Sequence, residues 1–265
     1  FSLKDLRVAI IGGGQSAAEI VYDILSKRDA MPSELLWISN RANFLPIDDS
    51  SFTNEFFTPT YSDYFFNLPL TERTVLLQEQ KLASDGINSS LLQKIYQKLY
   101  ELSFLNDVQD EYCLLPNHEL VEINHTQDNL NLSLRSKPDG SRIQINADIV
   151  ILATGFEYKI PSYLSSILEK IKIKNEHFSL NSDFSIEWNG PQQNKIFSQN
   201  TGRLIRGVSD PNLSLAAWRS ATIINSIAGK CIYDVEKTHS IFNKNKIANK
   251  DIQTKKQGRK SYEVL

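Results

Sequence analysis

Apolar and polar positions at the start of the chain follow two different periods. Residues 7–11 form a short apolar run of the kind found in a parallel strand that is covered on both faces. Residues 16–27 place apolar side chains three and four positions apart, which predicts an amphipathic helix. A second apolar run at 35–38 predicts the next strand. Strand, glycine turn, helix and strand in this order predict a βαβ unit of an α/β fold.

The rest of the chain predicts a long irregular segment followed by helices and strands. Residues 40–69 are rich in Phe, Pro, Asp, Asn and Tyr, and loops of this length inside a compact domain are usually functional. Helices are predicted at 70–81 and 90–102. Three strands are predicted within 119–151, with a turn at 137–140 between the second and the third and with the last strand at 147–153. A final helix is predicted at 215–228, capped by residues 212–214 and ended by Gly229.

Composition narrows the class of protein. The 265 residues suit one large or two smaller domains, and 41% hydrophobic with 23% charged residues is ordinary for a soluble globular protein. A net charge of −2 creates no basic field for nucleic acid, and no apolar run approaches a membrane-spanning length. Two cysteines cannot form a disulfide framework, so we expect a reducing compartment, the cytoplasm. The four histidines are scattered without ligand spacing, so no metal site is expected.

Both ends of the sequence suggest further expectations. The chain starts with Phe1 only a few residues before a predicted buried strand, which we interpret as a fragment cut at a domain boundary. The alternative is a mature chain whose leader was removed. Residues 236–265 carry eight Lys or Arg against three Asp or Glu and few apolar residues, which predicts a flexible, solvated basic tail. A nucleic-acid or membrane arm is the alternative reading of this tail.

The strongest motif is the glycine turn at residues 12–17, Gly-Gly-Gly-Gln-Ser-Ala, which fits G-x-G-x-x-G/A. It follows a predicted strand and opens a predicted helix, as in dinucleotide-binding proteins. Gly12 allows the tight turn, Gly14 lets the backbone approach a pyrophosphate, and the small Ala17 permits close packing of helix and strand. The unpaired N–H groups at the start of the helix would then bind the diphosphate. The alternative is a glycine turn without a ligand.

The end of the second strand indicates which dinucleotide binds. A carboxylate there would favour NAD or FAD, but the residues are Ser39, Asn40 and Arg41. Ser39 and Asn40 can hydrogen-bond a 2′-phosphate, and Arg41 can pair with it or stack on adenine. These residues therefore favour NADP(H), with a solvated surface arginine as the alternative for Arg41.

A second signal lies at residues 148–156, where an apolar strand ends in Ala-Thr-Gly-Phe. This strand, which ends at Thr154 and Gly155, is similar to the element that returns two-dinucleotide flavoproteins from the NADPH domain to the flavin domain. Small residues there let the backbone pass close to a cofactor. Such flavoproteins carry a first glycine motif for FAD near their N-terminus, and this sequence has none.

Three motifs occur in order along the chain. Residues 12–19 fit G-x-G-Q-S-A-A-E, the loop 43–57 fits D-[DE]-S-x-F-x-N-E-x-F, and residues 210–219 read Asp-Pro-Asn-Leu-Ser-Leu-Ala-Ala-Trp-Arg. Together they resemble the microbial N-hydroxylating flavoprotein monooxygenases of siderophore biosynthesis, which act on lysine, ornithine or diamines, and the third motif resembles that family's C-terminal motif on the flavin side. The likeness runs from about residue 5 to about residue 235 and covers only the NADPH-domain and C-terminal portions of the family's chain.

The resemblance implies a fold and a reaction. The fold is a Rossmann-like NADPH-binding domain at 1–153, with an inserted substrate loop at about 40–69, and the C-terminal part of a second Rossmann-like FAD domain at 154–235. NADPH reduces FAD, the reduced flavin takes up O2 to give a C4a-hydroperoxyflavin, and this hydroxylates the terminal primary amine of L-lysine, a related diamine or L-ornithine. The attacked amine must be neutral, although an alkylammonium has a pKa near ~10.4.

The resemblance also implies roles for residues on the NADPH side. Gly12, Gly14, Gln15 and Ser16 correspond to the contacts with the NADPH diphosphate and nicotinamide, and Arg41 to those with adenine and the 2′-phosphate.

On the substrate and flavin side, Asn54 matches the loop asparagine that contacts the substrate, and its alternative is a turn asparagine that serves its own loop. Asn212, Leu213 and Ser214 match the motif beside the flavin ring, with Ser214 facing the carboxylate end of amino-acid substrates. The alternative for Ser214 is a plain helix cap.

Departures from the family pattern bear on the substrate. The ornithine branch carries an Asn-Tyr pair where this chain reads Lys-Leu-Ala-Ser-Asp-Gly-Ile at 81–87, which is more similar to the lysine and diamine branch. Two other hypotheses stay open: another NADPH-dependent two-dinucleotide flavoprotein monooxygenase, and a non-catalytic NADP-binding module. A disulfide reductase would need a Cys-x-x-Cys motif, which is absent. Because the FAD turn is missing, we expect this chain by itself not to turn over, and the resemblance makes a homo-oligomer a further expectation.

Overall fold

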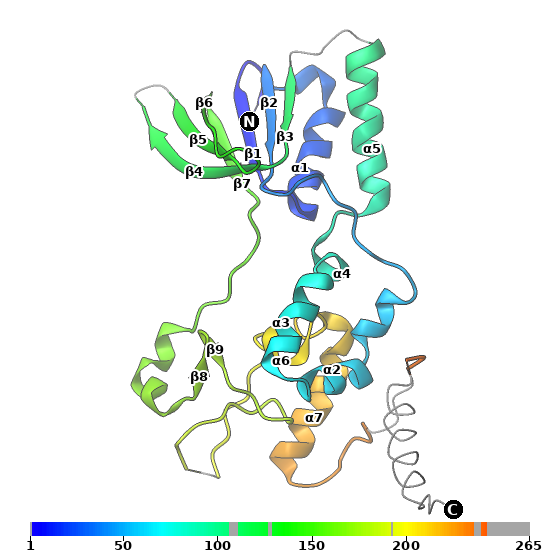
Figure 1. The fold of residues 1–265 in the computed structure, drawn as a ribbon, viewed down its shortest axis with the longest axis vertical. Coiled ribbons are helices and arrows are strands. Elements are labelled where there is room, and N and C mark those ends of the chain that lie inside the picture. The colour runs from blue at the N-terminus through cyan, green and yellow to red at the C-terminus, as the bar shows by residue number, and fades with distance from the viewer. Residues whose placement is uncertain (1, 106–110, 127–128, 192, 236–239, 243–265) are drawn as a thin grey trace, which may run out of the picture. The chain divides into compact units, whose positions relative to one another are not determined.

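The computed structural model describes residues 2–105, 111–126, 129–191, 193–235 and 240–242 (Figure 1). The predicted basic tail at 236–265 therefore lies outside the described residues, apart from 240–242. The chain forms two compact units. The first unit comprises Phe1–Asp49 and Gln78–Lys159, and the second comprises Ser50–Leu77 and Ile160–Leu265. The segment that was expected as an insertion in the first domain thus belongs largely to the second unit, whereas the assignment of either unit to a cofactor stays a prediction.

The first unit contains a four-stranded parallel sheet with the order β3-β2-β1-β7 (Figure 1). Its strands are β1 (Arg7–Ile11), β2 (Glu34–Ile38), β3 (Tyr112–Leu115) and β7 (Ile149–Leu152). Strand β1 lies in the middle and pairs with both β2 and β7. A parallel sheet in this order, with a helix crossing from β1 to β2, is Rossmann-like and confirms the predicted fold class.

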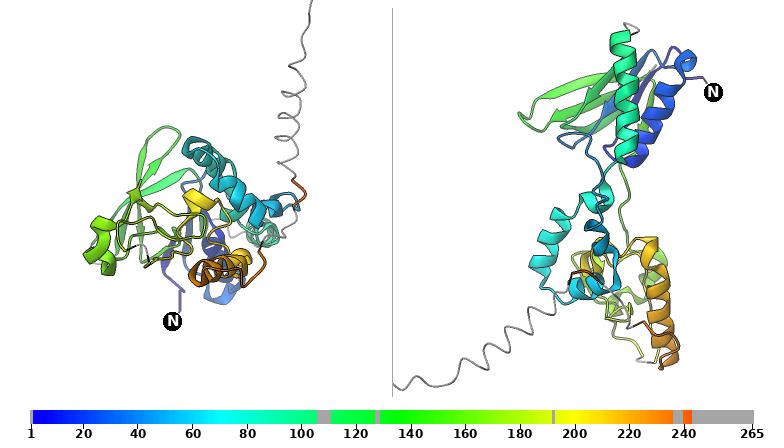
Figure 2. Two further views of the ribbon diagram at one scale, coloured as in Figure 1. Left: turned by 90° about the horizontal axis from the view of Figure 1, so that it is seen from below. Right: turned by 90° about the vertical axis from the view of Figure 1, so that its right-hand side faces the viewer.

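Helices cover one face of this sheet, and a small antiparallel sheet covers the other. Helices α1 (Gln15–Ser26) and α5 (Ser89–Tyr100) lie side by side on the first face, as Figures 1 and 2 show. Alternate residues of β1 separate the two cores. Val8 and Ile10 pack with residues of α1 and α5, whereas Ala9 and Ile11 pack with residues of the antiparallel sheet. All four side chains are at most 6% exposed, as predicted for a strand covered on both faces.

The antiparallel sheet has the order β4-β5-β6. Its strands are β4 (His118–His125), β5 (Leu130–Ser136) and β6 (Arg142–Ala147), and the predicted turn at 137–140 joins β5 to β6. The prediction of a single strand over 147–153 was wrong at its start. Strand β6 ends at Ala147 in one sheet, and β7 begins at Ile149 in the other. The prediction also missed β3 and β6.

Asp148 marks the change from one sheet to the other. Its carboxylate accepts hydrogen bonds from the Arg7 backbone N–H at 2.8 Å and from Arg7 Nη2 at 2.7 Å. The Asp148 N–H donates to the Arg7 carbonyl at 2.9 Å. Hydrogen bonds from the Arg7 side chain and backbone hold the pKa of Asp148 at about 2. The polar residue that interrupts the apolar run therefore fixes the start of β1 against the start of β7.

The second unit is built from short elements and irregular chain. Its helices and strands are α2 (Pro59–Phe66), β8 (Ile173–Lys174), β9 (His177–Phe178), α6 (Arg203–Arg206) and α7 (Ala216–Ala228). Helix α3 (Leu70–Glu79) begins in the second unit and ends in the first, and α4 (Leu82–Asp85) belongs to the first unit. Helix α7 ends at Gly229, which has a left-handed φ of 62° as predicted. No described helix is long and apolar enough to cross a membrane.

Residues 40–69 are less irregular than their composition predicts. A 3-10 turn, Thr53–Phe57, and helix α2 lie within them. The hydroxyl of Thr58 accepts a hydrogen bond from the Tyr61 N–H at 3.2 Å, and Pro59 stands at the first helical position. Both are ordinary helix-start signals that the aromatic composition of the segment obscured.

Candidate functional site

Gly12 ends β1 in a conformation that only glycine adopts without strain. Its φ is 149°, and an added Cβ would lie 2.2 Å from the carbonyl oxygen of Ala153. Its N–H donates to the Ile38 carbonyl at 2.8 Å, and its own carbonyl accepts from Trp37 Nε1 at 2.8 Å. Gly12 thus joins the ends of β1, β2 and β7, where the predicted dinucleotide turn begins.

Gly14 opens helix α1 and leaves its N-terminus accessible. An added Cβ at Gly14 would meet nothing within 4 Å. Among the described residues no side chain caps α1, and the first turn of the helix carries no acidic residue. The first N–H groups of a helix need partners, and the helix dipole favours an anion there. An uncapped 12-residue helix behind a glycine turn therefore fits a dinucleotide diphosphate.

Ser39 lies beneath the turn rather than on its surface. Its residue is 1% exposed, and its hydroxyl accepts a hydrogen bond from the Arg41 N–H at 3.1 Å. An added Cβ at Gly13 would lie 2.2 Å from Ser39 Oγ, so a larger residue there would have to displace this hydroxyl. The structure gives Ser39 a role in holding the turn against β2, and its expected contact with a 2′-phosphate stays a prediction.

Arg41 is not a solvated surface arginine. Its side chain is 16% exposed, and its Nη2 lies 3.2 Å from Asp85 Oδ2. Its Nη1 also donates to the backbone carbonyl of Asp85. The guanidinium is therefore held at a defined place beside the glycine turn, where it can meet an anion with little loss of side-chain freedom.

Gln15 and Ser16 occupy the first turn of α1. The Gln15 side-chain oxygen accepts from the Asn88 N–H at 2.8 Å, and its amide donates to Glu19 Oε1 at 2.9 Å. Ser16 is exposed. Thr154 and Gly155, which follow β7 in the same unit, are exposed too, and Gly155 has a φ of 93°. The first unit thus contains every residue predicted to contact NADPH, together with the Thr-Gly pair.

The predicted substrate and flavin residues lie in the second unit. Asn54 sits on the 3-10 turn, where its N–H donates to the Ser50 carbonyl at 3.1 Å. Its side chain is exposed and has no hydrogen-bond partner among the described residues. The loop is instead held by Ser50 and Thr53, whose hydroxyls are 2.9 Å apart. The 3-10 turn does not use the Asn54 side-chain amide in a hydrogen bond, so this amide is available to contact a substrate.

The segment Asn212, Leu213 and Ser214 precedes α7. The side-chain oxygen of Asn212 accepts from the Ser214 N–H at 2.8 Å, so Asn212 is the cap and Ser214 is not. Leu213 is 81% exposed, and the Ser214 hydroxyl is exposed without a hydrogen-bond partner among the described residues. This arrangement argues against the reading of Ser214 as a plain helix cap.

Two buried charged residues, Arg219 and Asp210, lie next to the Asn212–Ser214 segment. Arg219 is 2% exposed, and its Nη2 donates to Asn200 Oδ1 at 2.9 Å and to the Asn212 carbonyl at 3.5 Å. Asp210 is also 2% exposed and accepts from the Gly202 N–H at 2.8 Å. Burial raises the pKa of Asp210, although the Gly202 N–H and the two nearby arginines oppose that rise. Sequence reasoning placed Asp210 and Arg219 in a motif but gave them no role.

A second buried arginine, Arg206, was missed entirely. It is fully buried, its Nη1 lies 2.7 Å from Asp63 Oδ1, and its guanidinium stacks at 4.4 Å from the Phe66 ring centre and 4.5 Å from that of Phe184. Its Nη2 donates to the Ser182 carbonyl. Arg206 thereby joins α2, α6 and the chain around 182–184. A short Gly-Arg-Leu-Ile-Arg-Gly stretch offers no periodic signal from which this burial could be read.

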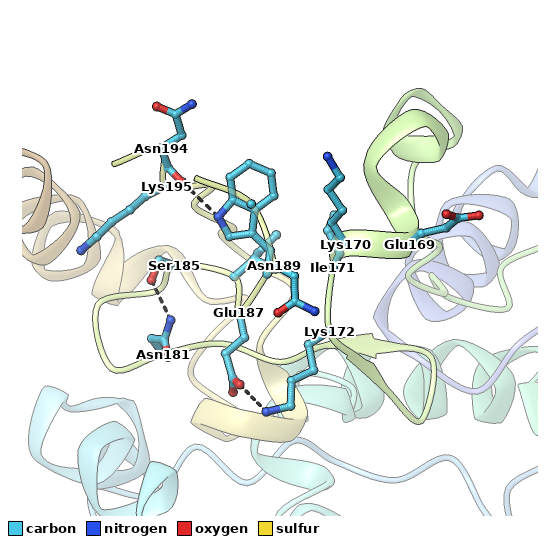
Figure 3. A pocket seen from close by; sticks show the side chains of 13 residues that line it. Glu169, Lys170, Ile171, Lys172, Asn181, Ser185, Glu187, Asn189, Asn194 and Lys195 are labelled. Atoms are coloured by element: carbon cyan, nitrogen blue, oxygen red, sulfur yellow. Dashed lines mark hydrogen bonds and ion pairs between the residues drawn. The ribbon is translucent and has the colours of Figure 1, made fainter. Parts of the chain in front are cut away.

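A polar cavity in the second unit contains none of the predicted site residues. It has a volume of about 500 Å³ and lies between residues 169–172 and residues 185–190 and 194–195 (Figure 3). Lys172 pairs with Glu187 in its wall, and Trp188 Nε1 donates to the Asn194 carbonyl at 3.0 Å. Among the described residues no three His, Cys, Asp or Glu side chains form a group that could hold a metal ion.

With this geometry in view, comparison with known proteins identifies the class. The family model for L-lysine 6-monooxygenase/L-ornithine 5-monooxygenase matches residues 2–158. The chain therefore belongs to this family, which confirms the resemblance found in the sequence motifs.

Individual relatives are similar over most of the chain. The L-lysine N6-monooxygenase of Escherichia coli is 34% identical over 88% of this chain and 55% of that protein. The putrescine N-hydroxylase of Acinetobacter baumannii is 33% identical over 87% of this chain and 50% of its own. A solved structure of the FAD-bound cadaverine monooxygenase from Erwinia amylovora superposes with a TM-score of 0.81 at 29% identity, over 90% of this chain and 55% of that one. The chain thus spans about half the length of the relatives it matches.

Proposed function

We propose that the protein takes part in the FAD- and NADPH-dependent N-hydroxylation of a primary amine for hydroxamate siderophore biosynthesis. The observation that carries this proposal is the family match over residues 2–158. The geometry supports it because the glycine turn, the uncapped start of α1 and the held Arg41 together fit an NADP-type dinucleotide. The exposed Asn212-Leu213-Ser214 segment is the part of the chain we assign to the flavin.

Bound FAD, once reduced by NADPH, supplies the activation of O2 that the reaction needs. This chain's own residues would bind and orient the nicotinamide nucleotide in the first unit and the amine in the second unit. Gly12, Gly14, Gln15, Ser16 and Arg41 are assigned to the nucleotide, with Thr154 and Gly155 leading the chain out of that unit.

Amine hydroxylation needs a neutral nitrogen with a free lone pair. A neutral amide such as Asn54 can hydrogen-bond the amine and stabilises the ammonium form less than an unpaired carboxylate would. The neighbouring Glu55 carboxylate already accepts from Ser240 Oγ at 2.6 Å and from the Ile241 N–H at 3.0 Å. Asn54 and Ser214 are therefore our candidates for the residues that contact the amine substrate.

We place the substrate among L-lysine and the diamines rather than L-ornithine. The residues at 81–87 lack the Asn-Tyr pair of the ornithine branch. The relatives named above act on lysine, putrescine and cadaverine. We also expect a cytoplasmic protein, in line with the two free cysteines Cys113 and Cys231, and a homo-oligomer.

The test uses the full-length protein reconstituted with FAD. NADPH oxidation is followed with lysine, ornithine, putrescine and cadaverine, and hydroxylamine is quantified against peroxide. Hydroxylamine formed with lysine or a diamine is the expected result. Peroxide alone with every amine would overturn N-hydroxylation and move the chemistry to a carbon or sulfur acceptor, and NADPH binding without any oxidation would favour a non-catalytic module.

A further inference from the structure

The end of α4 and the residues that follow it contact two of the side chains predicted to bind the nucleotide, Arg41 and Gln15. Asp85, the last residue of α4, binds the Arg41 guanidinium through its carboxylate and through its backbone carbonyl. Three residues later, the Asn88 N–H donates to the Gln15 side chain at 2.8 Å. Residues 85–88 therefore contact Arg41, which lies beside the glycine turn, and Gln15, the first residue of α1.

The backbone around Asp85 is fixed by its neighbours. An added Cβ at Gly86 would lie 2.3 Å from the backbone of Ile47, so this stretch lies directly against residues 46–47. The Ile47 N–H donates to the Ile87 carbonyl at 2.8 Å, and the Ile87 N–H donates to the Leu45 carbonyl at 2.9 Å. Ile87 itself is fully buried. The backbone that carries the Asp85 side chain is therefore held by contacts with residues 45–47.

Arg41 and Lys81 both lie near the Asp85 carboxylate. Asp85 Oδ2 lies 3.2 Å from Arg41 Nη2 and 3.8 Å from Lys81 Nζ, so one carboxylate is shared between two cations. The Asp85 side chain is 42% exposed and that of Lys81 58%. An incoming phosphate carries more negative charge than a carboxylate and matches the guanidinium fork in two places. It can therefore displace Asp85 from Arg41, and Lys81 is near enough to share either anion.

Resting on the proposed function, we propose that Asp85 is a specificity-determining residue that competes with the 2′-phosphate of NADPH for the Arg41 guanidinium. The carboxylate keeps Arg41 oriented toward the nucleotide and at the same time limits the affinity for the phosphate. Lys81 opposes this effect, because it draws the same carboxylate away from Arg41. Arg41, Asp85 and Lys81 thus together set the preference for NADPH over NADH. Only Arg41 lies at the end of β2, where sequence motifs place the residue that contacts the 2′-phosphate.

The experiment measures dissociation constants of NADP+ and NAD+ with the FAD-loaded, full-length protein at low and high salt. Asp85→Asn keeps the side-chain size and the backbone carbonyl but removes the competing charge. We expect it to bind NADP+ about three- to fivefold more tightly at low salt, with less effect at high salt. NAD+ has no 2′-phosphate, so its binding should change less than about twofold.

Two further variants make the result specific. Asp23→Asn removes the same charge from an exposed pair with Lys27 on α1, and it should leave both constants unchanged. Lys81→Gln should act in the opposite direction and weaken NADP+ binding, and it also tests the inference if Asp85→Asn does not fold. Unchanged or weaker NADP+ binding by a folded Asp85→Asn variant would overturn this inference alone. No binding of NADP+ by the wild-type protein would overturn the proposed function instead.

Discussion

The glycine turn of the first unit and the Asn212–Ser214 segment of the second unit present polar groups to solvent by opposite means. The turn is held by hydrogen bonds from the Gly12 backbone to Ile38 and Trp37 of β2 and by its close approach to Ala153, which leaves no room for a side chain at Gly12. The Asn212–Ser214 segment is held by Arg219, which lies 3.7 Å from the carboxylate of Asp210, and both charged residues are 2% exposed. The glycine turn thus depends on a residue without a side chain, whereas the Asn212–Ser214 segment depends on buried charged side chains.

This difference bears on how each region can change. Backbone amides bind phosphate with little help from side chains, so the turn tolerates variation around it as long as the glycines remain. A segment supported by buried ionic side chains depends on those side chains keeping their partners, and loss of one partner leaves another charge unsatisfied. We therefore expect mutations to affect folding of the second unit more often, and nucleotide binding in the first unit more selectively.

The largest expected effect is on the second unit. Arg206→Ala should lower the free energy of unfolding by about 3–5 kcal/mol, because it empties the space between Phe66 and Phe184 and breaks the pair with Asp63. The control is Arg135→Ala, which breaks an exposed pair with Glu119 and should leave the free energy of unfolding nearly unchanged. Urea unfolding followed by tryptophan fluorescence measures both. Equal losses in the two variants would contradict the structural role given to Arg206.

Next in size is a matched pair in the glycine turn. Gly12→Ala should cost about 2–4 kcal/mol of stability, because its Cβ would overlap the Ala153 carbonyl at a φ of 149°. Gly14→Ala should cost below about 1 kcal/mol, because its Cβ meets nothing. If the diphosphate approaches Gly14 closely, this second variant should nevertheless weaken NADP+ binding about tenfold. Thermal unfolding and NADP+ titration of both variants separate the two roles, and a stable Gly12→Ala protein would refute the packing argument.

A smaller, pH-dependent effect is expected at the junction of the two sheets in the first unit. The pKa of Asp148 is lowered to about 2 by hydrogen bonds from Arg7, so its contribution to stability is present above about pH 4 and lost as the pH falls through about 2. Asp148→Asn should therefore cost about 1 kcal/mol at pH 7, since the pair is partly exposed. Urea midpoints of both proteins should converge on acidification. A difference that stays constant from pH 7 to pH 2.5 would rule out this ionic contribution.

The difference between the two units also explains which parts of the structure could be predicted from the sequence. Strand β1, helix α1 and strand β2 were predicted to within one or two residues, because their periods and the glycine turn are local signals. The residues predicted to contact NADPH were placed together for the same reason. The competing Asp85 was missed, since its contact with Arg41 depends on the packing of residues 45–47 against 86–87.

In the second unit, local signals were few. The burial of Arg206 depends on Asp63, Ser182 and Phe184, and that of Arg219 on Asn200 and Asn212, all brought together only by the fold. Helix α2 was missed although its Thr-Pro start is readable. The motif at 210–219 was recognised by resemblance, but its supporting contacts could not be predicted from spacing.

The most direct test of the central claim, that the nucleotide binds through the first unit and the amine through the second, is a steady-state comparison of two variants of the full-length protein. KM values for NADPH and for the best amine are measured with hydroxylamine as the product. The account predicts that Arg41→Ala raises the KM for NADPH by about tenfold or more and leaves that for the amine unchanged. Asn54→Ala should do the reverse. Both variants altering the same KM, or neither altering its own, would contradict the assignment of the two sites.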